Sequence, residues 1–267
     1  MSRLLIEKDG PVWTGKFNNP PHSYMDDLTA EALWNFLNEI EASDEVRVVI
    51  LTGSEPDVFI RHYDVSVLLE RGQAMAGKGM KFSLERLVPE SQLHQALARM
   101  ESLAIPFIAA INGTAMGGGF EISLACDLRL VQDGPYHLGL PEVSLGLLAG
   151  AGGTQRLPRL IGQSRALELE LLGKTLSPQQ AVQYGIAAEC VEGDVRSHAK
   201  TVALRLAEKS PAAVAYIKQL VRGAAQWPLA EGLAKERTLF CDLMMASFSL
   251  DEMSQFVASE SHLQDWK

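Results

Sequence analysis

The hydrophobic positions in the first 190 residues switch repeatedly between a strand period and a helix period. Residues 3–17 alternate apolar and polar side chains around Asp9-Gly10, which predicts a β-hairpin. Residues 28–42 carry apolar side chains at helical spacing, and residues 46–51 form a β-branched run of strand length. Because strands and helices keep alternating, the pattern predicts parallel strands joined by crossover helices.

The segment between residues 59 and 103 has a mixed pattern. Residues 59–64 predict a loop, and Asp64 at its end is placed to cap a following helix. Residues 71–90 are rich in glycine and basic side chains, so we expect a mobile loop there, a candidate lid. Residues 92–103 again show a helical apolar face.

The second half of the chain ends in a helical region. A loop is predicted over 132–153, followed by helices at 154–172 and 178–184. Helical patterns then cover 195–208, 211–223 and 229–246, and Ser249 with Glu252 is expected to cap a final helix. We therefore divide the chain into a core, residues 1–194, and a helical region, residues 195–267. The helical region must bury its apolar faces on the core or on a neighbouring subunit.

One stretch in the middle of the chain combines a buried strand, a glycine turn and a helix start. The apolar run 107–111 ends at Asn112-Gly113, and three glycines follow at 117–119. A helical pattern begins there, with Glu121 in its first turn. Free N–H groups at a helix start bind negative charge, and glycine lets a ligand approach the backbone closely. The stretch therefore predicts an anion or oxyanion site with an acid/base beside it.

Composition and charge exclude several classes of protein. A net charge of −9 argues against a nucleic-acid surface, and there is no apolar run long enough to span a bilayer. The first ten residues include acidic side chains where a signal peptide would be apolar. Three distant cysteines form neither a disulfide framework nor a metal motif, which favours reduced, buried thiols. We expect a cytoplasmic protein.

Two carboxylates, Glu121 and Glu142, are the candidates for chemistry. Taken singly, Glu121 is explained by the helix dipole and Glu142 by a solvated loop after Pro141. Taken together, both lie in apolar stretches, which would raise their pKa values and suit them to proton transfer. The glycines do not fit the dinucleotide-binding spacing, and the six histidines show no metal-binding spacing. The residues alone leave open whether these acids are catalytic.

Three runs of the sequence resemble the crotonase superfamily, and most of all the enoyl-CoA hydratases. They are IAAINGTAMGGGFEISLACDLRL at 108–130, LGLPEVSLGLLAGAGGTQRLPRLIG at 138–162 and LLGKTLSPQQAVQYGIA at 171–187. The resemblance implies an α/β fold, a spiral of ββα units with a C-terminal helical trimerisation region, assembled as a homotrimer or a dimer of trimers. It also implies an acyl-CoA substrate, a place in fatty acid metabolism, and no metal or redox cofactor beyond the coenzyme A of the substrate.

The resemblance also assigns roles to residues. The backbone N–H of Gly118 and that of Arg61 would form an oxyanion hole for the thioester oxygen. Glu121 would take a proton from the attacking water, and Glu142 would protonate C2. The residues expected to line the substrate site beside these are His62, Tyr63, Asp64 and Gly117.

One segment departs from the family pattern. His62 stands where the loop before Asp64 usually has glycine, and the bulky side chains at 61–63 could reshape the acyl or pantetheine channel. Arg61 is also a candidate for recognising an acidic acyl group. Because both acids are kept, we favour hydration of an enoyl-CoA. The alternatives are a crotonase-fold isomerase, a C–C bond hydrolase, or a non-catalytic scaffold, which the altered loop favours.

Overall fold

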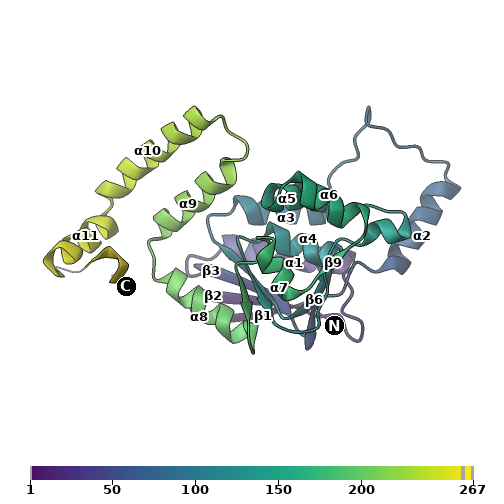
Figure 1. The fold of residues 1–267 in the computed structure, drawn as a ribbon, viewed down its shortest axis with the longest axis horizontal. Helices are drawn as coiled ribbons and strands as arrows, with labels where there is room; N and C mark the ends of the chain where they lie inside the picture. The colour runs from purple at the N-terminus through teal and green to yellow at the C-terminus, as the bar shows by residue number, and fades with distance from the viewer. Residues whose placement is uncertain (1, 260–261, 266–267) are drawn as a thin grey trace.

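Two sheets with helices packed on them form the core of the computed structural model, which describes residues 2–259 and 262–265 (Figure 1). The six-stranded sheet has the order β1 (Leu4–Asp9), β2 (Val12–Phe17), β3 (Val48–Gly53), β5 (Phe107–Ile111), β7 (Leu128–Gln132) and β10 (Glu189–Val191). The four-stranded sheet has the order β4 (Asp57–Ile60), β6 (Gly113–Met116), β8 (Leu138–Gly139) and β9 (Thr175–Leu176). Pairing is parallel except between β1 and β2 and between β8 and β9, so the predicted parallel crossovers are confirmed.

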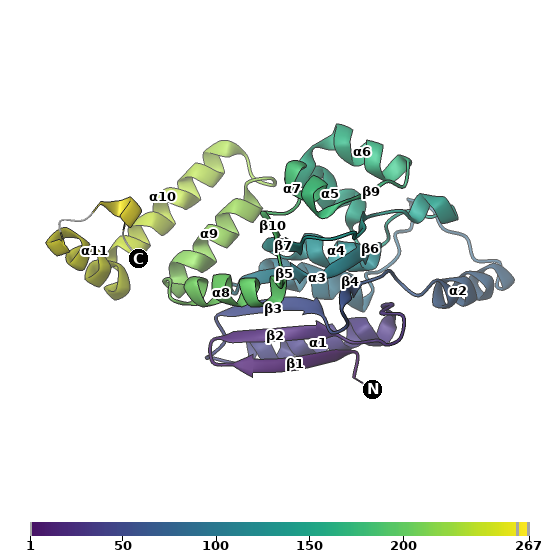
Figure 2. The same ribbon diagram turned by 60° about the horizontal axis from the view of Figure 1, so that its bottom comes forward.

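Helices cover both faces of the six-stranded sheet (Figure 2). On one face lie α1 (Asp27–Glu41), α3 (Gln92–Ser102) and α4 (Gly118–Ala125), and on the other lies α8 (Val195–Ala207). The α1 side chains predicted to face the core, among them Leu33 and Phe36, are fully buried. Asp26 and Thr29 form a capping box at the start of this helix. The remaining helices are α2 (Val65–Gly77), η1 (Glu142–Leu145), α5 (Gly153–Ile161), α6 (Gln163–Leu171), α7 (Pro178–Gln183), α9 (Pro211–Gly223), α10 (Leu229–Met245), α11 (Ser247–Ser259) and η2 (Leu263–Asp265).

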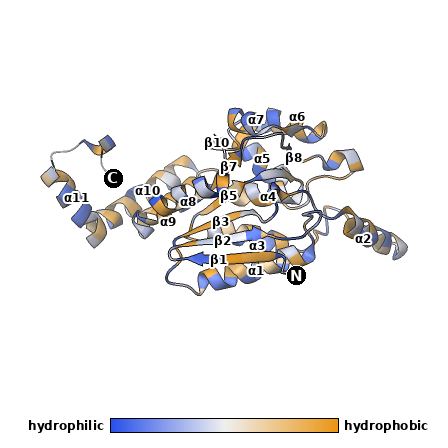
Figure 3. Ribbon diagram, turned by 90° about the horizontal axis from the view of Figure 1, so that it is seen from below, coloured by the Kyte–Doolittle hydropathy of each residue, from blue (hydrophilic) through white to orange (hydrophobic). Residues whose placement is uncertain are grey.

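Helices α10 and α11 extend away from the sheets, whereas α9, which precedes them, packs against the core (Figures 1 and 2). Helices α10 and α11 bury none of their residues against the rest of the described chain, and Phe240 is 61% exposed and Met245 74% exposed. Orange apolar positions along both helices are visible in Figure 3. The core therefore does not cover these two helices. The division into 1–194 and 195–267 stays a prediction, and residues 1, 260–261 and 266–267 lie outside the described structure.

Several local predictions were wrong. The segment predicted as a loop from residue 71 is helical as far as Gly77, and Phe59 and Ile60 end a strand. The helix predicted over 154–172 is two helices separated at Gly162, whose φ of +81° breaks the helical path. The last helix starts at Ser247, so Ser249 lies inside it and does not cap it. Cys126 is buried as expected, whereas Cys241 is exposed.

Candidate active site

The glycine turn between β6 and α4 exposes backbone donors at a helix start. Gly117 precedes the helix with φ +52°, and the first turn closes with the Glu121 N–H donating to Gly117 O at 2.9 Å. The N–H of Gly118, one residue into the helix, therefore has no acceptor within it. A Cβ on Gly118 would stand 2.5 Å from Met25 Sδ, so a larger residue here would require the buried Met25 side chain to move.

Glu121 is held rigidly below this turn. Its side chain is on α4 and the residue is 2% exposed. Oε1 accepts hydrogen bonds from the N–H groups of Ala151, at 2.6 Å, and of Gly153, at 2.7 Å. Burial raises the pKa of this carboxyl, and the two N–H donors act in the opposite direction by stabilising the carboxylate. The sequence indicated Glu121 as a candidate, but it did not indicate the two backbone N–H groups that fix its carboxylate.

Glu142 reaches the same turn from the first residue of η1. Its Oε1 lies 2.8 Å from the place where a Cβ on Gly117 would stand. Its Oε2 is buried and takes no hydrogen bond from the described part of the chain. Burial first, and then the charge of Glu121, raise the pKa of Glu142 to about 7. The fold thus brings together two acids that are 21 residues apart in the sequence, beside one glycine turn.

The segment 61–64 offers a different amide from the one predicted. The Arg61 N–H donates to Ser23 O at 2.9 Å, so this amide is engaged within the protein. Tyr63 forms a parallel bridge with Met25: the Met25 N–H donates to His62 O, and the Asp64 N–H donates to Met25 O. The N–H of Tyr63 then points to the opposite side of the segment. In this structure the predicted Arg61 donor is therefore not available, and the amide of Tyr63 faces away from the strand partner.

His62 occupies the usual glycine position without backbone strain. Only Ser23 and Asp57 among the described non-glycine residues have positive φ, so His62 does not need the conformation that favours glycine. Its ring stacks on Tyr24 with the ring centroids 4.4 Å apart. A Cβ on Gly117 would lie 3.8 Å from the Cβ of His62, which places His62 at the edge of the turn.

Two other residues predicted at the site have partners that explain them structurally. The Tyr63 hydroxyl donates to Asp27 Oδ1 at 2.6 Å. Asp64 caps α2, since its Oδ1 accepts from the Ser66 N–H at 2.9 Å, as the sequence predicted. Their side chains thus hold the segment in place, and contact with a substrate stays a prediction for both.

A third acid near the pair was missed in the sequence. Glu170, on α6, is half-buried, and burial followed by the charge of Glu142 raises its pKa. The sequence did not mark it, because Glu170 alternates with leucines just as the exposed Glu168 does, and the contact between α6 and η1 appears only in the fold. A Cβ on Gly173 would stand 3.0 Å from Ser144 Oγ.

Two features are absent from the described residues. No group of three or more His, Cys, Asp or Glu side chains in this part of the chain is arranged to hold a metal ion. Among its helices, none combines the length and the apolar character needed to cross a membrane.

The sequence model described as enoyl-CoA hydratase/isomerase matches residues 7–262. The chain belongs to this family. A protein named short-chain-enoyl-CoA hydratase, from Clostridium acetobutylicum, is 31% identical over 259 residues, 96% of this chain and 95% of that protein. A 2,3-dehydroadipyl-CoA hydratase from Escherichia coli is 32% identical and covers 96% of both chains. These names support the prediction that this member of the enoyl-CoA hydratase/isomerase family is a hydratase enzyme.

Solved structures confirm the predicted fold. An enoyl-CoA hydratase from Bacillus anthracis has a TM-score of 0.84 at 30% identity, covering 96% of each chain. A structure from Geobacillus kaustophilus, titled as an enoyl-CoA hydratase subunit, has a TM-score of 0.84 at 32% identity, covering 99% of this chain and 98% of that one. The crotonase-like α/β fold is therefore shared with members of the enoyl-CoA hydratase/isomerase family.

Proposed function

We propose that the protein adds water across the 2,3 double bond of an enoyl-CoA thioester, with Glu121 and Glu142 as its acid/base pair. The observation that carries the proposal is the meeting of the two carboxylates at the Gly117 turn. One of them is fixed by two backbone donors, and the other has an unpaired buried oxygen. A pair of acids in different surroundings is what an addition of water requires, since one proton must be taken and another given.

The thioester oxygen would bind at the start of α4. As water attacks C3, negative charge moves onto this oxygen, and a positioned N–H donor contributes about 2.7–4 kcal/mol to its stabilisation. Gly118 would supply one donor. For the second donor we assign the amide of Tyr63 in place of that of Arg61, because Arg61 already donates to Ser23. His62, Tyr63 and Gly117 would border the bound acyl group.

The surroundings of the two acids favour different protonation states. The Ala151 and Gly153 N–H groups stabilise the carboxylate of Glu121, which suits it to accept a proton from water. Glu142 has no donor at Oε2 and a pKa of about 7, which suits it to hold a proton and give it to C2. The new C3–O bond and the new C2–H bond then complete hydration, and the proton on Glu121 returns to Glu142 before the next turnover. Coenzyme A enters as part of the substrate, and no further cofactor takes part in this scheme.

The names of two relatives indicate which acyl groups to consider as substrates. One is named for short-chain substrates and one for an enoyl-CoA that ends in a carboxylate. Arg61 lies beside the site on an exposed segment, and its Nε donates to His22 O at 3.1 Å. We propose a short acyl chain as the substrate and retain Arg61 as the residue that would recognise an acidic end. A cytoplasmic location and a role in fatty acid metabolism belong to the same proposal.

Assembly as a homotrimer or a dimer of trimers is part of the proposal too. Its support is the apolar surface of α10 and α11, which the rest of the described chain leaves exposed. Burying such surface on neighbouring copies would stabilise the helices by about 25 cal/mol per Å² of apolar area.

A turnover screen tests the function. The loss of conjugated thioester absorbance is measured for a series of enoyl-CoAs from short to long acyl chains and for one that ends in a carboxylate. Hydration of short chains is the expected result, and an absence of hydration with every thioester, despite binding of acyl-CoA, would refute it. Isomerisation or C–C cleavage would be seen as a different product by mass spectrometry, and an absence of acyl-CoA binding would point to a scaffold.

A further inference from the structure

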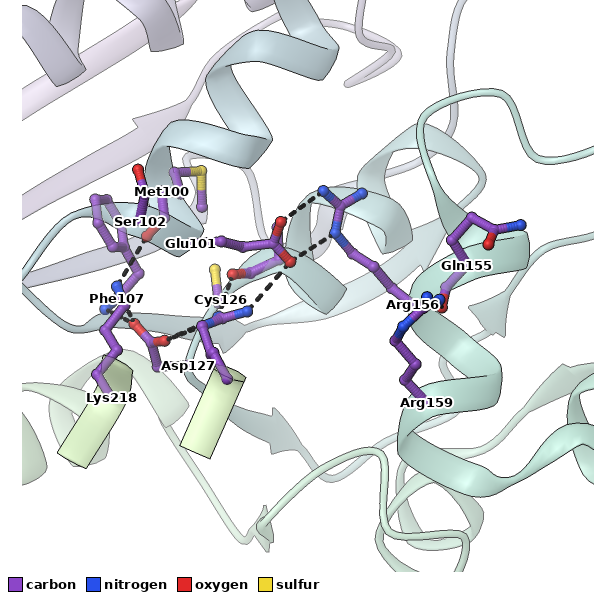
Figure 4. A network of polar contacts seen from close by, with 12 residues as sticks. Met100, Glu101, Ser102, Phe107, Cys126, Asp127, Gln155, Arg156, Arg159 and Lys218 are labelled. Atoms are coloured by element: carbon purple, nitrogen blue, oxygen red, sulfur yellow. Dashed lines mark hydrogen bonds and ion pairs between the residues drawn. The ribbon is translucent and has the colours of Figure 1, made fainter. Parts of the chain in front are cut away.

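A chain of ion pairs links helix α9 to the core (Figure 4). On α9, Arg222 binds Asp127 through Nε at 2.9 Å and Glu101 through Nη1 at 3.1 Å. Lys218, one turn earlier and 8% exposed, binds Asp127 Oδ2 at 2.8 Å and the carbonyl oxygens of Met100 and Ile105. These contacts fix α9 to the end of α3 and to the start of β7.

The same chain continues from Glu101 to α5. Arg156 binds Glu101 with two parallel hydrogen bonds, Nε to Oε1 and Nη2 to Oε2, both 2.8 Å long. Such a bidentate pair fixes the plane of the guanidinium. Its remaining nitrogen, Nη1, donates to the carbonyl oxygen of Ala151 at 2.8 Å. The N–H of Ala151 is one of the two donors to Glu121 Oε1.

The backbone at this point is shaped for Arg156. Gly152 has φ +105°, and a Cβ there would stand 2.1 Å from Arg156 Nη1. Any side chain at Gly152 would therefore meet the guanidinium, and the glycine leaves the space in which Arg156 reaches Ala151. A second contact comes from Arg222, whose Nη2 donates to Ala125 O at 2.7 Å, at the end of the helix that carries Glu121.

We propose that Arg156 is a positioning residue for Glu121, and that its hold on the Ala151–Gly153 backbone depends on the docking of α9 through Arg222 and Glu101. Arg156 does not touch the reacting atoms in this scheme. It orients the two N–H groups that fix the carboxylate, so the base lies in the correct place only when α9 is seated. The catalytic part of this inference rests on the proposed hydration.

Removal of Arg156 changes both geometry and charge at Glu121. The charged groups that face Glu121 are Arg156 from α5, Glu170 from α6 and Glu142 from η1. Arg156 lowers the pKa of Glu121, whereas Glu170 raises it. Without Arg156, both remaining neighbours are acids, so the pKa of Glu121 rises further. A variant should therefore lose turnover and shift its pH profile, which a purely structural ion pair would not produce.

The first experiment compares Arg156→Gln with Arg159→Gln in the full chain. Arg159 lies on the same helix, and its Nη1 contacts the carbonyl oxygen of Gln155. In Arg156→Gln we expect kcat to fall about 10- to 100-fold, because small misplacements of a base are costly. KM should stay within about twofold. In the same variant the acidic limb of the pH profile should move to higher pH. Arg156→Lys should recover part of the rate. The control, Arg159→Gln, should have the kcat and pH profile of the unchanged protein.

A second readout does not need turnover. Hydrogen–deuterium exchange of the Ala151 and Gly153 amides, which donate to Glu121, should accelerate in Arg156→Gln and less strongly in Arg222→Gln, with α1 as an internal reference. If the protein proves not to hydrate enoyl-CoA, the proposed function fails while this exchange still tests the positioning. Unchanged exchange, kcat and pH profile in folded Arg156→Gln would overturn the inference. Should that variant not fold, Glu101→Gln, which removes the anion and keeps the shape, is judged by the same outcomes.

Discussion

Glu142 Oε1 lies 2.8 Å from the position that a Cβ on Gly117 would occupy, so the acid and the glycine depend on each other. Gly117→Ala would strain a backbone held at φ +52° and ψ −130° by about 1–3 kcal/mol and displace the Glu142 carboxylate. We expect at least a roughly tenfold loss of hydratase kcat. Gly10→Ala is the control, since Gly10 has the same φ with nothing within 4 Å of its Cβ. Equal kcat in the two variants would show that turnover depends neither on the Gly117 backbone nor on its contact with Glu142.

The two acids should be separately essential. Glu121→Gln and Glu142→Gln preserve size and remove proton transfer, so each should lower kcat by about 10²–10⁴-fold. Binding of the substrate should persist in both, because neither change removes the proposed N–H donors. The check is steady-state hydration together with calorimetric titration of the hydroxyacyl-CoA product. Full activity in either variant would mean that the site has been assigned to the wrong carboxylate.

The pH dependence of kcat/KM should be that of two carboxyl groups, Glu121 and Glu142, which share one proton. Burial raises the pKa of both acids, to about 7 for Glu142, and the reactive form has Glu121 ionised and Glu142 protonated. A profile of kcat/KM should therefore be bell-shaped, falling on the alkaline side as the pair loses its last proton near or above pH 7. Hydration and dehydration should give the same profile, since the reaction consumes no net proton. Constant kcat/KM from pH 5 to 9 would contradict the assignment.

Glu142 should cost stability at neutral and higher pH. Its folded-state pKa is raised to about 7, so between about pH 4.5 and 7 the native state holds a proton that the unfolded chain has lost. The free energy of unfolding contributed by Glu142 therefore decreases as pH rises through this window. Glu142→Gln should raise Tm by roughly 2–4 °C at pH 8 and by less at pH 5. Glu85→Gln, at an exposed acid, is the control and should leave Tm unchanged at both values.

Much of the fold could be predicted because the hydrophobic periodicity and the local turn and capping residues indicate the same elements. The turn at Gly10, the buried face of α1 and the Asp64 cap are all local features, and each was found from neighbouring residues. The break at Gly162 was missed because a helical apolar pattern continues on both sides of it. Strand β6 was missed because it is four residues long and begins with the glycine that looked like part of a turn.

The site was harder to predict where it depends on contacts between distant segments. Glu121 and Glu142 could be found because acids in apolar surroundings are conspicuous in a sequence. Their common position at Gly117, the Ala151 and Gly153 donors, and Glu170 follow from packing that no local pattern encodes. The sequence predicted an oxyanion donor at Arg61, and it does not say that the Arg61 N–H donates to Ser23 O in the folded chain.

The choice between the Arg61 and Tyr63 amides can be decided one atom at a time. Replacing the residue at 63 by its α-hydroxy acid analogue turns the amide into an ester, which removes the N–H and weakens His62 O as an acceptor for the Met25 N–H. If this N–H stabilises the oxyanion, kcat should fall by about 10²–10³-fold. The same exchange at residue 61 removes the bond to Ser23 O and should lower Tm while leaving kcat near that of the unchanged protein. The reverse pattern, with loss of turnover at 61 and not at 63, would return the second donor to Arg61 and require the Ser23 bond to open when substrate binds.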